Sequence, residues 1–153
     1  MALIEGFTGQ GGRSISFTRG FGLRAGAVAT TYVHPYYTLL VVGADDGSMA
    51  LADNRLAELG GGIVVVRDGR VVREWLLDEV GVFSNEPLAT VRDEFAAMNE
   101  AIRSLGCPFK APVLALSFVA LPTIPALGLT SKGLYDVNQG RFVPAVLGGA
   151  PDG

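Results

Sequence analysis

The stretch that decides the fold is Ile63-Val64-Val65-Val66-Arg67-Asp68-Gly69-Arg70-Val71-Val72. Two β-branched apolar runs flank the dipeptide Asp68-Gly69, and Asp-Gly is a preferred pair for the tight turn of a β-hairpin. The stretch therefore predicts a hairpin, and we expect its second strand to continue through residues 75–77.

Short strands separated by glycine-rich turns are predicted on the N-terminal side of this hairpin. Ile15 and Phe17 alternate with serine and threonine, which is the period of two typical of a strand. Residues 27–31 and 38–42 predict two further strands, which we expect to lie side by side. The glycines of residues 20–26 predict a turn and not a dinucleotide site, because the third glycine is one place late and an extended segment follows.

Two segments carry helical periodicity. The first follows the N-cap candidates Asp45, Asp46 and Ser48, and residues 60–62, all glycine, end it. The second opens at Asn85-Glu86-Pro87, with Ser84 or Asn85 as the expected N-cap and the proline in the first turn, and Gly106 closes it. Its apolar stripe, which we interpret as core packing, consists of Leu88, Val91, Phe95, Met98, Ile102 and Leu105.

The C-terminal third reads as strands at residues 113–120, 134–137 and 142–147, followed by a tail at 148–153 that we expect to fray. Residues 111–129 carry no charge over nineteen positions, but three prolines interrupt them, so we predict a buried core segment and no membrane span. The fold class predicted is α+β: a single domain in which an antiparallel or mixed sheet is covered by two main helices.

Composition excludes several function classes. The chain has 153 residues, 49% of them hydrophobic and 18% charged, which is too apolar for disorder and indicates apolar surface covered by a partner. A net charge of −3 without a basic block argues against nucleic-acid binding. One cysteine, Cys107, and one histidine, His34, are too few for a disulfide or a Cys/His metal site. We expect a cytoplasmic protein that holds no transition metal, with Cys107 as a buried thiol.

The aromatic stretch Tyr32-Val33-His34-Pro35-Tyr36-Tyr37 is the candidate ligand- or partner-facing patch, together with Arg19. Two interpretations stay open: a histidine bonded to backbone, or a pocket wall that faces a planar ligand. In a regular strand Tyr36 would share a face with His34 and Tyr37 would point the other way, whereas a bulge at Pro35 would exchange them.

At these residues the sequence resembles the C-terminal domain of bacterial adenine deaminases, in the amidohydrolase superfamily. The resemblance runs from about residue 3 to residue 146. Its matching segments are Thr18-Arg19-Gly20-Phe21-Gly22-Leu23, Leu39-Leu40-Val41-Val42-Gly43, Asn54-Arg55-Leu56-Ala57-Glu58-Leu59-Gly60-Gly61-Gly62, Ser84-Asn85-Glu86-Pro87-Leu88, Leu116-Ser117-Phe118-Val119-Ala120-Leu121-Pro122-Thr123-Ile124-Pro125 and Leu129-Thr130-Ser131-Lys132-Gly133-Leu134-Tyr135-Asp136-Val137.

The resemblance implies a parent enzyme that hydrolyses adenine to hypoxanthine and ammonia. In that family a hydroxide bound to Mn or Fe attacks the purine, and the metal ligands lie in a (β/α)₈ barrel that precedes this domain. A chain with one histidine lacks the His-x-His and further histidine ligands of such a barrel. The resemblance therefore implies a domain at residues 3–147 without catalytic residues, metal or cofactor of its own, whose expected partners are a metal-bearing barrel or identical subunits, with a purine as candidate ligand.

The sequence departs from this family at its polar motifs. After Ile4-Glu5 the usual Arg-His-His is Gly6-Phe7-Thr8, and the usual His-Asp-Ser-His-Asn keeps only His34. Three functions therefore stay open: the C-terminal part of an adenine-deaminase-like hydrolase, a stand-alone oligomeric binding module, or an autonomous hydrolase using His34. The last is disfavoured because no acidic pair flanks His34 in sequence.

Overall fold

The computed structural model describes residues 1–6, 11–34, 38–121, 123 and 126–146. The predicted hairpin is formed by β5 (Gly62–Arg67) and β6 (Arg70–Leu76), which pair antiparallel with Arg67 opposite Arg70. Both turn residues have positive φ, 52° at Asp68 and 70° at Gly69. Two such residues in a two-residue loop make a type I′ turn, whose twist matches that of the strands it joins. The hairpin prediction is confirmed.

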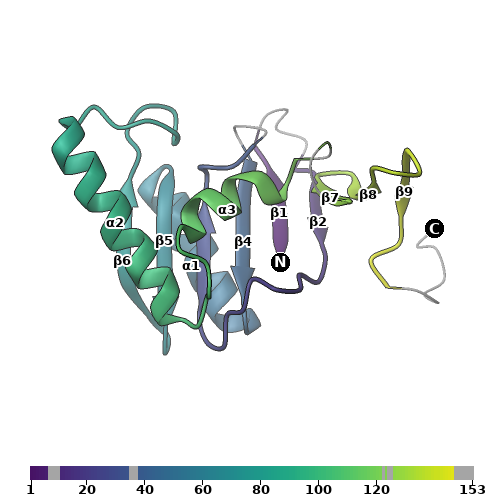
Figure 1. Cartoon of the computed structure of the whole chain (residues 1–153), viewed down its shortest axis with the longest axis horizontal. Helices are drawn as coiled ribbons and strands as arrows, with labels where there is room; N and C mark the ends of the chain where they lie inside the picture. Colours follow the sequence, from purple (N-terminus) through teal and green to yellow (C-terminus); the bar gives the residue numbers. More distant parts are fainter. Residues whose placement is uncertain (7–10, 35–37, 122, 124–125, 147–153) are drawn as a thin grey trace.

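The hairpin is one edge of a six-stranded sheet with the order β2-β1-β4-β3-β5-β6. Its other strands are β1 (Ala2–Glu5), β2 (Arg13–Ile15), β3 (Ala27–Thr30) and β4 (Thr38–Gly43), and all neighbours run antiparallel. The expected pairing of residues 27–31 with 38–42 is therefore confirmed. A small sheet of β7 (Leu127–Thr130), β8 (Gly133–Asp136) and β9 (Arg141–Val143) lies at the end of the molecule far from the second helix (Figure 1).

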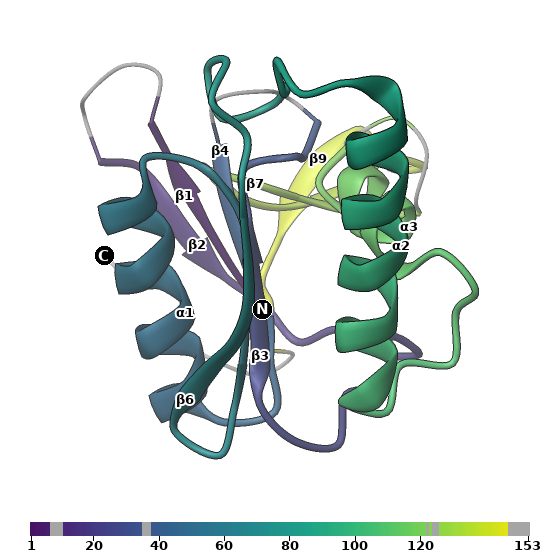
Figure 2. The same cartoon turned by 90° about the vertical axis from the view of Figure 1, so that its left-hand side faces the viewer.

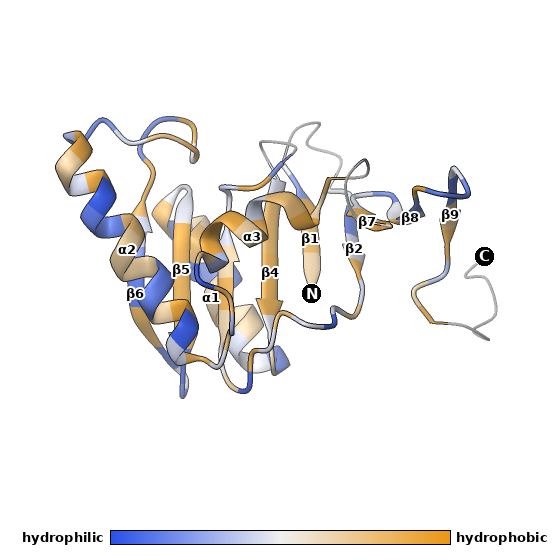
Figure 3. Cartoon of the chain, viewed as in Figure 1, coloured by the Kyte–Doolittle hydropathy of each residue, from blue (hydrophilic) through white to orange (hydrophobic). Residues whose placement is uncertain are grey.

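Helices cover both faces of the large sheet. Figure 2 shows α1 (Asp46–Leu59) on one side and α2 (Leu88–Ser104) with α3 (Pro112–Val119) on the other. Alternate residues of β3 and β5 therefore belong to two separate hydrophobic cores. Ala29 and Val64 lie in the core under α1, and Val28 and Val65 lie in the core under α2 and α3. Because these strands are buried on both faces, they read in the sequence as continuous apolar runs, and Figure 3 shows β5 as a hydrophobic strand inside the molecule.

Local chemistry explains the ends of α1. The carboxylate of Asp45 accepts a hydrogen bond from the backbone N–H of Ser48 at 2.7 Å, which makes Asp45 the N-cap. Gly60 ends the helix in the left-handed region at φ 85°, where its N–H bonds back to the carbonyls of Leu56 and Ala57. The predicted cap and stop are both confirmed.

The start of α2 differs from the prediction. The helix begins at Leu88 with Pro87 as its N-cap, so the proline precedes the first turn. Ser84 and Asn85 do not cap the helix, because Ser84 accepts from the N–H of Glu86 while Asn85 donates to Asp78. The apolar stripe is buried only toward its C-terminal end: Met98 and Ile102 are fully buried, whereas Leu88 is 84% exposed. The interpretation of Leu88 as a core residue was wrong, because the stripe extends beyond the sheet that it covers.

Residues 113–120 were predicted as a strand, and this prediction was wrong because they form α3. Pro112 occupies the first turn, where a missing N–H costs nothing. The side chain of Asn99 on α2 then accepts from the N–H of Val113 at 3.1 Å, so an adjacent helix satisfies one of the free donors. The fold is α+β with a mostly antiparallel sheet, as predicted, and the third helix is an addition.

Two predictions concern the C-terminal end of the chain. The strand expected at residues 142–147 ends at Val143, because Pro144 follows and cannot donate to a strand ladder. The tail at 148–153 lies outside the described residues. Among the helices of the described part, none combines the length and the apolar character needed to cross a bilayer.

Candidate functional site

His34 follows β3 and is bonded to α3. Its backbone N–H donates to the carbonyl of Ser117 at 2.9 Å, and its Nδ1 lies 3.1 Å from the same oxygen. The imidazole also stacks on the ring of Phe118, with ring centroids 5.6 Å apart and planes at 4°. These contacts fit the first of the two interpretations above, a histidine bonded to backbone. A ligand-facing role for His34 stays a prediction.

Of the other candidates, the structure describes only Arg19. Arg19 lies exposed in the segment between β2 and β3, whereas His34 lies in the connection from β3 to β4. Tyr36 and Tyr37 lie outside the described residues, so the expected choice between their two faces stays a prediction. Cys107 is buried, at 4% exposure, and it follows the C-terminus of α2 as expected for a structural thiol.

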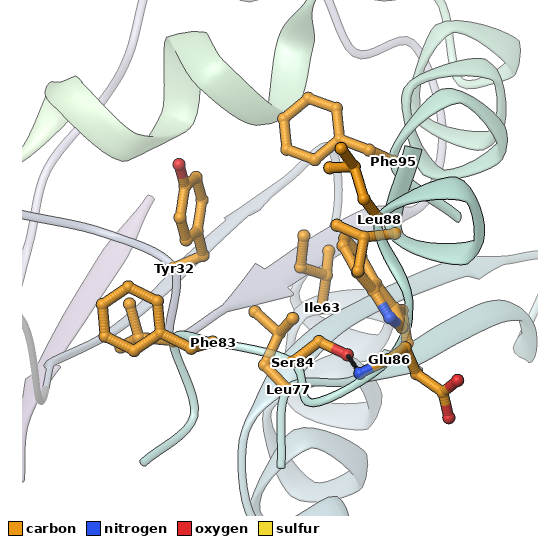
Figure 4. Close-up of a pocket in the computed structure, with 11 residues that line it drawn as sticks. Tyr32, Ile63, Leu77, Phe83, Ser84, Glu86, Leu88 and Phe95 are labelled. Atoms are coloured by element: carbon orange, nitrogen blue, oxygen red, sulfur yellow. Dashed lines mark hydrogen bonds between the residues drawn. The ribbon is translucent and has the colours of Figure 1, made fainter. Parts of the chain in front are cut away.

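The sequence did not indicate the cleft that the structure forms between Tyr32, the segment of residues 77–88 and the first half of α2 (Figure 4). We call it the aromatic cleft. It has a volume of about 370 Å³ and is lined by four aromatic, five aliphatic and two polar side chains. The four aromatic side chains are Tyr32, Trp75, Phe83 and Phe95. An apolar concavity with a few polar groups is the usual form of a small-molecule site.

Three elements hold the aromatic walls of this cleft. The ring of Phe95, from α2, meets Tyr32 edge-on at 6.4 Å between centroids and Trp75, from β6, edge-on at 6.3 Å. Such T-shaped pairs are the favoured arrangement of aromatic rings. Tyr32 is placed by the end of β3, where its N–H donates to the hydroxyl of Thr30 at 2.9 Å.

The loop that forms the outer wall is fastened to the sheet. The hydroxyl of Thr31 donates to the carbonyl of Gly81 at 2.6 Å and accepts from the N–H of Gly62 at 2.7 Å. Within the loop, the N–H of Glu79 donates to the carbonyl of Phe83 at 2.9 Å. Val80 has a positive φ of 51°, which is costly for a β-branched residue, and the surrounding bonds hold it there.

The charged side chains around the cleft are acidic. Glu86 lines it and also lines a neighbouring cleft of about 330 Å³ with Glu74, Asp78 and Glu94. Glu74 pairs with Arg55 at 2.6 Å, and this hydrogen bond lowers the pKa of the Glu74 carboxyl. The pKa of Asp78 is lowered by the hydrogen bond from the backbone N–H of Asn85. The carboxylates of Glu74 and Asp78 are therefore ionised at neutral pH.

The metal of the resembled enzymes does not fit these side chains. Over the residues that the structure describes, no group of three or more His, Cys, Asp or Glu side chains is placed to hold a metal ion.

Comparison with known proteins gives the family. Residues 1–141 match the family described as "Adenine deaminase C-terminal domain". An adenine deaminase from Cereibacter sphaeroides is 44% identical over 144 residues, which is 94% of this chain and 26% of that protein. Another from Brucella abortus is 45% identical over 143 residues, with 94% of this chain and 25% of that protein covered. A third, from Moorella thermoacetica, is 41% identical over 148 residues, covering 97% of this chain and 25% of that protein.

These matches span nearly the whole chain but only about a quarter of the length of each relative. They agree with the fold described above, a single α+β domain. The chain belongs to the adenine deaminase C-terminal domain family.

Proposed function

We propose that this chain acts as the C-terminal domain of an adenine-deaminase-like purine aminohydrolase, is not catalytic by itself, and packs against a metal-bearing barrel. The observation that carries the proposal is the match to this family over residues 1–141, at 94% of the chain and about a quarter of the relatives. The lone buried thiol, Cys107, supports a cytoplasmic location for the assembly.

An uncovered part of the large sheet, at β1 and β2, supports the docking of such a partner. On its face of the sheet, α1 packs mainly on β3, β4 and β5. On the same face β1 stays open, and a shallow groove of about 130 Å³ runs between Ile4 of β1 and Met49 of α1. Ile15 of β2 lies opposite Ala2 in register and is 72% exposed, and Phe17 beyond it is 84% exposed. We call this surface, from Ile4 to Phe17, the open sheet half.

Exposed apolar side chains in such a row are typical of a surface that another protein covers. Fully burying a side chain of the size of Ile15 or Phe17 contributes about 1.5 to 3 kcal/mol. Since these two residues are nearly fully exposed in the isolated domain, that free energy is available to an interface. The function proposed for the open sheet half is therefore to brace the barrel.

A chimera tests the proposal. The matched quarter of the Cereibacter sphaeroides adenine deaminase is replaced with this chain, and the release of ammonia from adenine is measured beside the same enzyme truncated at the junction. We expect the chimera to deaminate adenine and to resist heat better than the truncated enzyme. The double variant Ile15→Ser, Phe17→Ser should lose that gain, whereas the control Phe142→Ser, an equally apolar and half-exposed site on β9, should keep it. A chimera no better than the truncated enzyme would contradict the proposal.

The second candidate is a stand-alone oligomeric module, and the open sheet half favours it as well, because β2 is an edge strand of the sheet. Light scattering of the purified chain tests it together with a thermal-shift screen of purines. An oligomer that dissociates in the Ile15→Ser, Phe17→Ser variant supports this function. A monomer that no purine stabilises leaves the barrel-bracing domain as the function.

A further inference from the structure

We propose that the aromatic cleft binds a small organic cation with an apolar body, such as an arylalkylammonium ion. This site is independent of the proposed function, because it lies on the opposite face of the sheet from the open sheet half. The inference rests on three features of the described residues: the aromatic walls, the sign of the charge at the rim, and the fastening of the outer loop.

The walls suit an apolar ring. A volume of about 370 Å³ accommodates a one-ring or two-ring molecule together with its side chain. At the mouth, Phe83 is 60% exposed and Leu88 is 84% exposed, so a ligand that enters the cleft would remove apolar surface from water on both sides. The rings of Tyr32 and Trp75 also attract a cation through their negative faces.

The rim selects for positive charge. Lysine and arginine are absent among the lining residues of both clefts, while Glu74, Asp78, Glu86 and Glu94 line them. Glu74 and Glu94 are each paired with an arginine. Over the described residues Glu86 has no such ion pair, and it lines both clefts. A ligand ammonium at this carboxylate would neutralise Glu86 while the ring occupies the apolar side.

The N-terminus of α2 opposes the binding of a cation. The N-terminus of α2 lies at the mouth, Pro87 supplies no side-chain cap, and the free N–H groups of a first helical turn favour an anion. Glu86 directly precedes this turn and already places a negative charge beside it. We therefore expect the cation to bind more tightly, and an anionic probe of the same size measures the competing effect.

The outer loop is held before any ligand arrives. Thr31 bonds both to Gly81 in the loop and to Gly62 in β5, so the wall that carries Phe83 is fixed to the sheet. A prearranged wall reduces the entropy lost on binding. The cleft is thus suited to bind without a large rearrangement.

Trp75 allows a direct test, because it is the chain's one tryptophan and it lines the cleft. The purified chain is titrated with phenethylammonium, with the neutral 2-phenylethanol and with the anionic phenylacetate, and tryptophan fluorescence is recorded at an excitation that tyrosine does not absorb. We expect saturable binding of phenethylammonium, roughly two- to fivefold tighter than that of 2-phenylethanol, since an exposed ion pair is worth up to about 1 kcal/mol and about 1.4 kcal/mol is tenfold in affinity. Phenylacetate should bind most weakly.

Two surface variants and their matched controls separate the charge from the ring. Glu86→Gln should remove the preference for the cation and leave 2-phenylethanol unchanged, whereas Glu58→Gln on α1 should change neither. Phe83→Ala should weaken all three probes, whereas Phe142→Ala, similarly exposed on β9, should weaken none. No saturable fluorescence change, equal affinity for the cation and the anion, or a cation preference that survives Glu86→Gln would each overturn the proposal.

Discussion

The two ends of α2 should respond very differently to the same kind of truncation. Ile102 is fully buried between the sheet and α3, while Leu88 is 84% exposed at the first turn. Ile102→Ala should lower the free energy of unfolding by about 2 to 5 kcal/mol, because it removes buried methyl groups and leaves a cavity. Leu88→Ala should change it by less than about 0.5 kcal/mol, because an exposed side chain loses little and alanine is at least as good a helix former as leucine.

Urea unfolding followed by Trp75 fluorescence and by far-ultraviolet circular dichroism measures both variants against the unaltered chain. For a domain of this size, 1 kcal/mol corresponds to about 2 to 4 °C in Tm, so Ile102→Ala should melt roughly 4 to 20 °C lower while Leu88→Ala melts within about 2 °C of the unaltered chain. An unchanged slope of free energy against urea would show that stability changed and not compactness. Equal losses in the two variants would refute the partition of α2 into a buried and an exposed end.

Three further predictions concern single positions. Gly26 has φ +69°, and a Cβ there would lie 2.1 Å from the carbonyl oxygen of Val66. Gly26→Ala should therefore lower the free energy of unfolding, measured in urea, by at least about 2 kcal/mol. A loss near zero would contradict the strand geometry. The backbone hydrogen bond from Ser48 lowers the pKa of Asp45. The stabilisation by the ionised cap is therefore present above the unfolded pKa of about 3.9 and is lost as pH falls through the folded pKa. Asp45→Asn should keep the cap and flatten the acid side of the curve of stability against pH. Burial raises the pKa of Asp53, so its ionised form opposes folding, and Asp53→Asn should raise the urea midpoint at neutral pH but not near pH 3, below the unfolded pKa of about 3.9.

Elements whose structure is decided by neighbouring residues could be predicted from the sequence. The turn at Asp68 and Gly69 requires positive φ at two consecutive positions, and those residue types provide it. The cap at Asp45 and the stop at Gly60 act within one helical turn of the residues that they bond. In each case the deciding interaction spans a few residues, and the pattern contains it.

Elements decided by distant contacts were mistaken or missed. An apolar run without periodicity fits a buried strand as well as a buried helix, and residues 113–120 become a helix where α2 supplies Asn99 to their first turn. Leu88 continues the period of the core stripe, but whether a position is buried depends on where the sheet stops. The sequence could therefore predict the fold class, while the third helix and the exposed end of α2 required the tertiary structure.

The aromatic cleft shows the same limit for the site. Its walls come from Tyr32, Trp75 and Phe95, which are distant in the sequence and meet because β3 and β6 flank β5 while α2 packs across them. The aromatic stretch at residues 32–37 drew attention to the right strand end, but of its described residues Tyr32, and not His34, lines the cleft.

The two proposed surfaces lie on opposite faces of the large sheet. Figure 2 shows α1 and α2 on opposite sides of the sheet. The open sheet half lies beside α1 at β1 and β2, and the aromatic cleft lies under α2 at the β6 end of the sheet. A partner seated on the first surface therefore leaves the mouth of the second accessible. Coupling between sites requires each ligand to bind two states of the protein differently. Because the two surfaces share no lining residue, docking should leave the affinity of the cleft unchanged. Phenethylammonium should then bind the chimera and the isolated chain with equal Kd; a difference of tenfold would show that the barrel reaches the cleft or alters its walls.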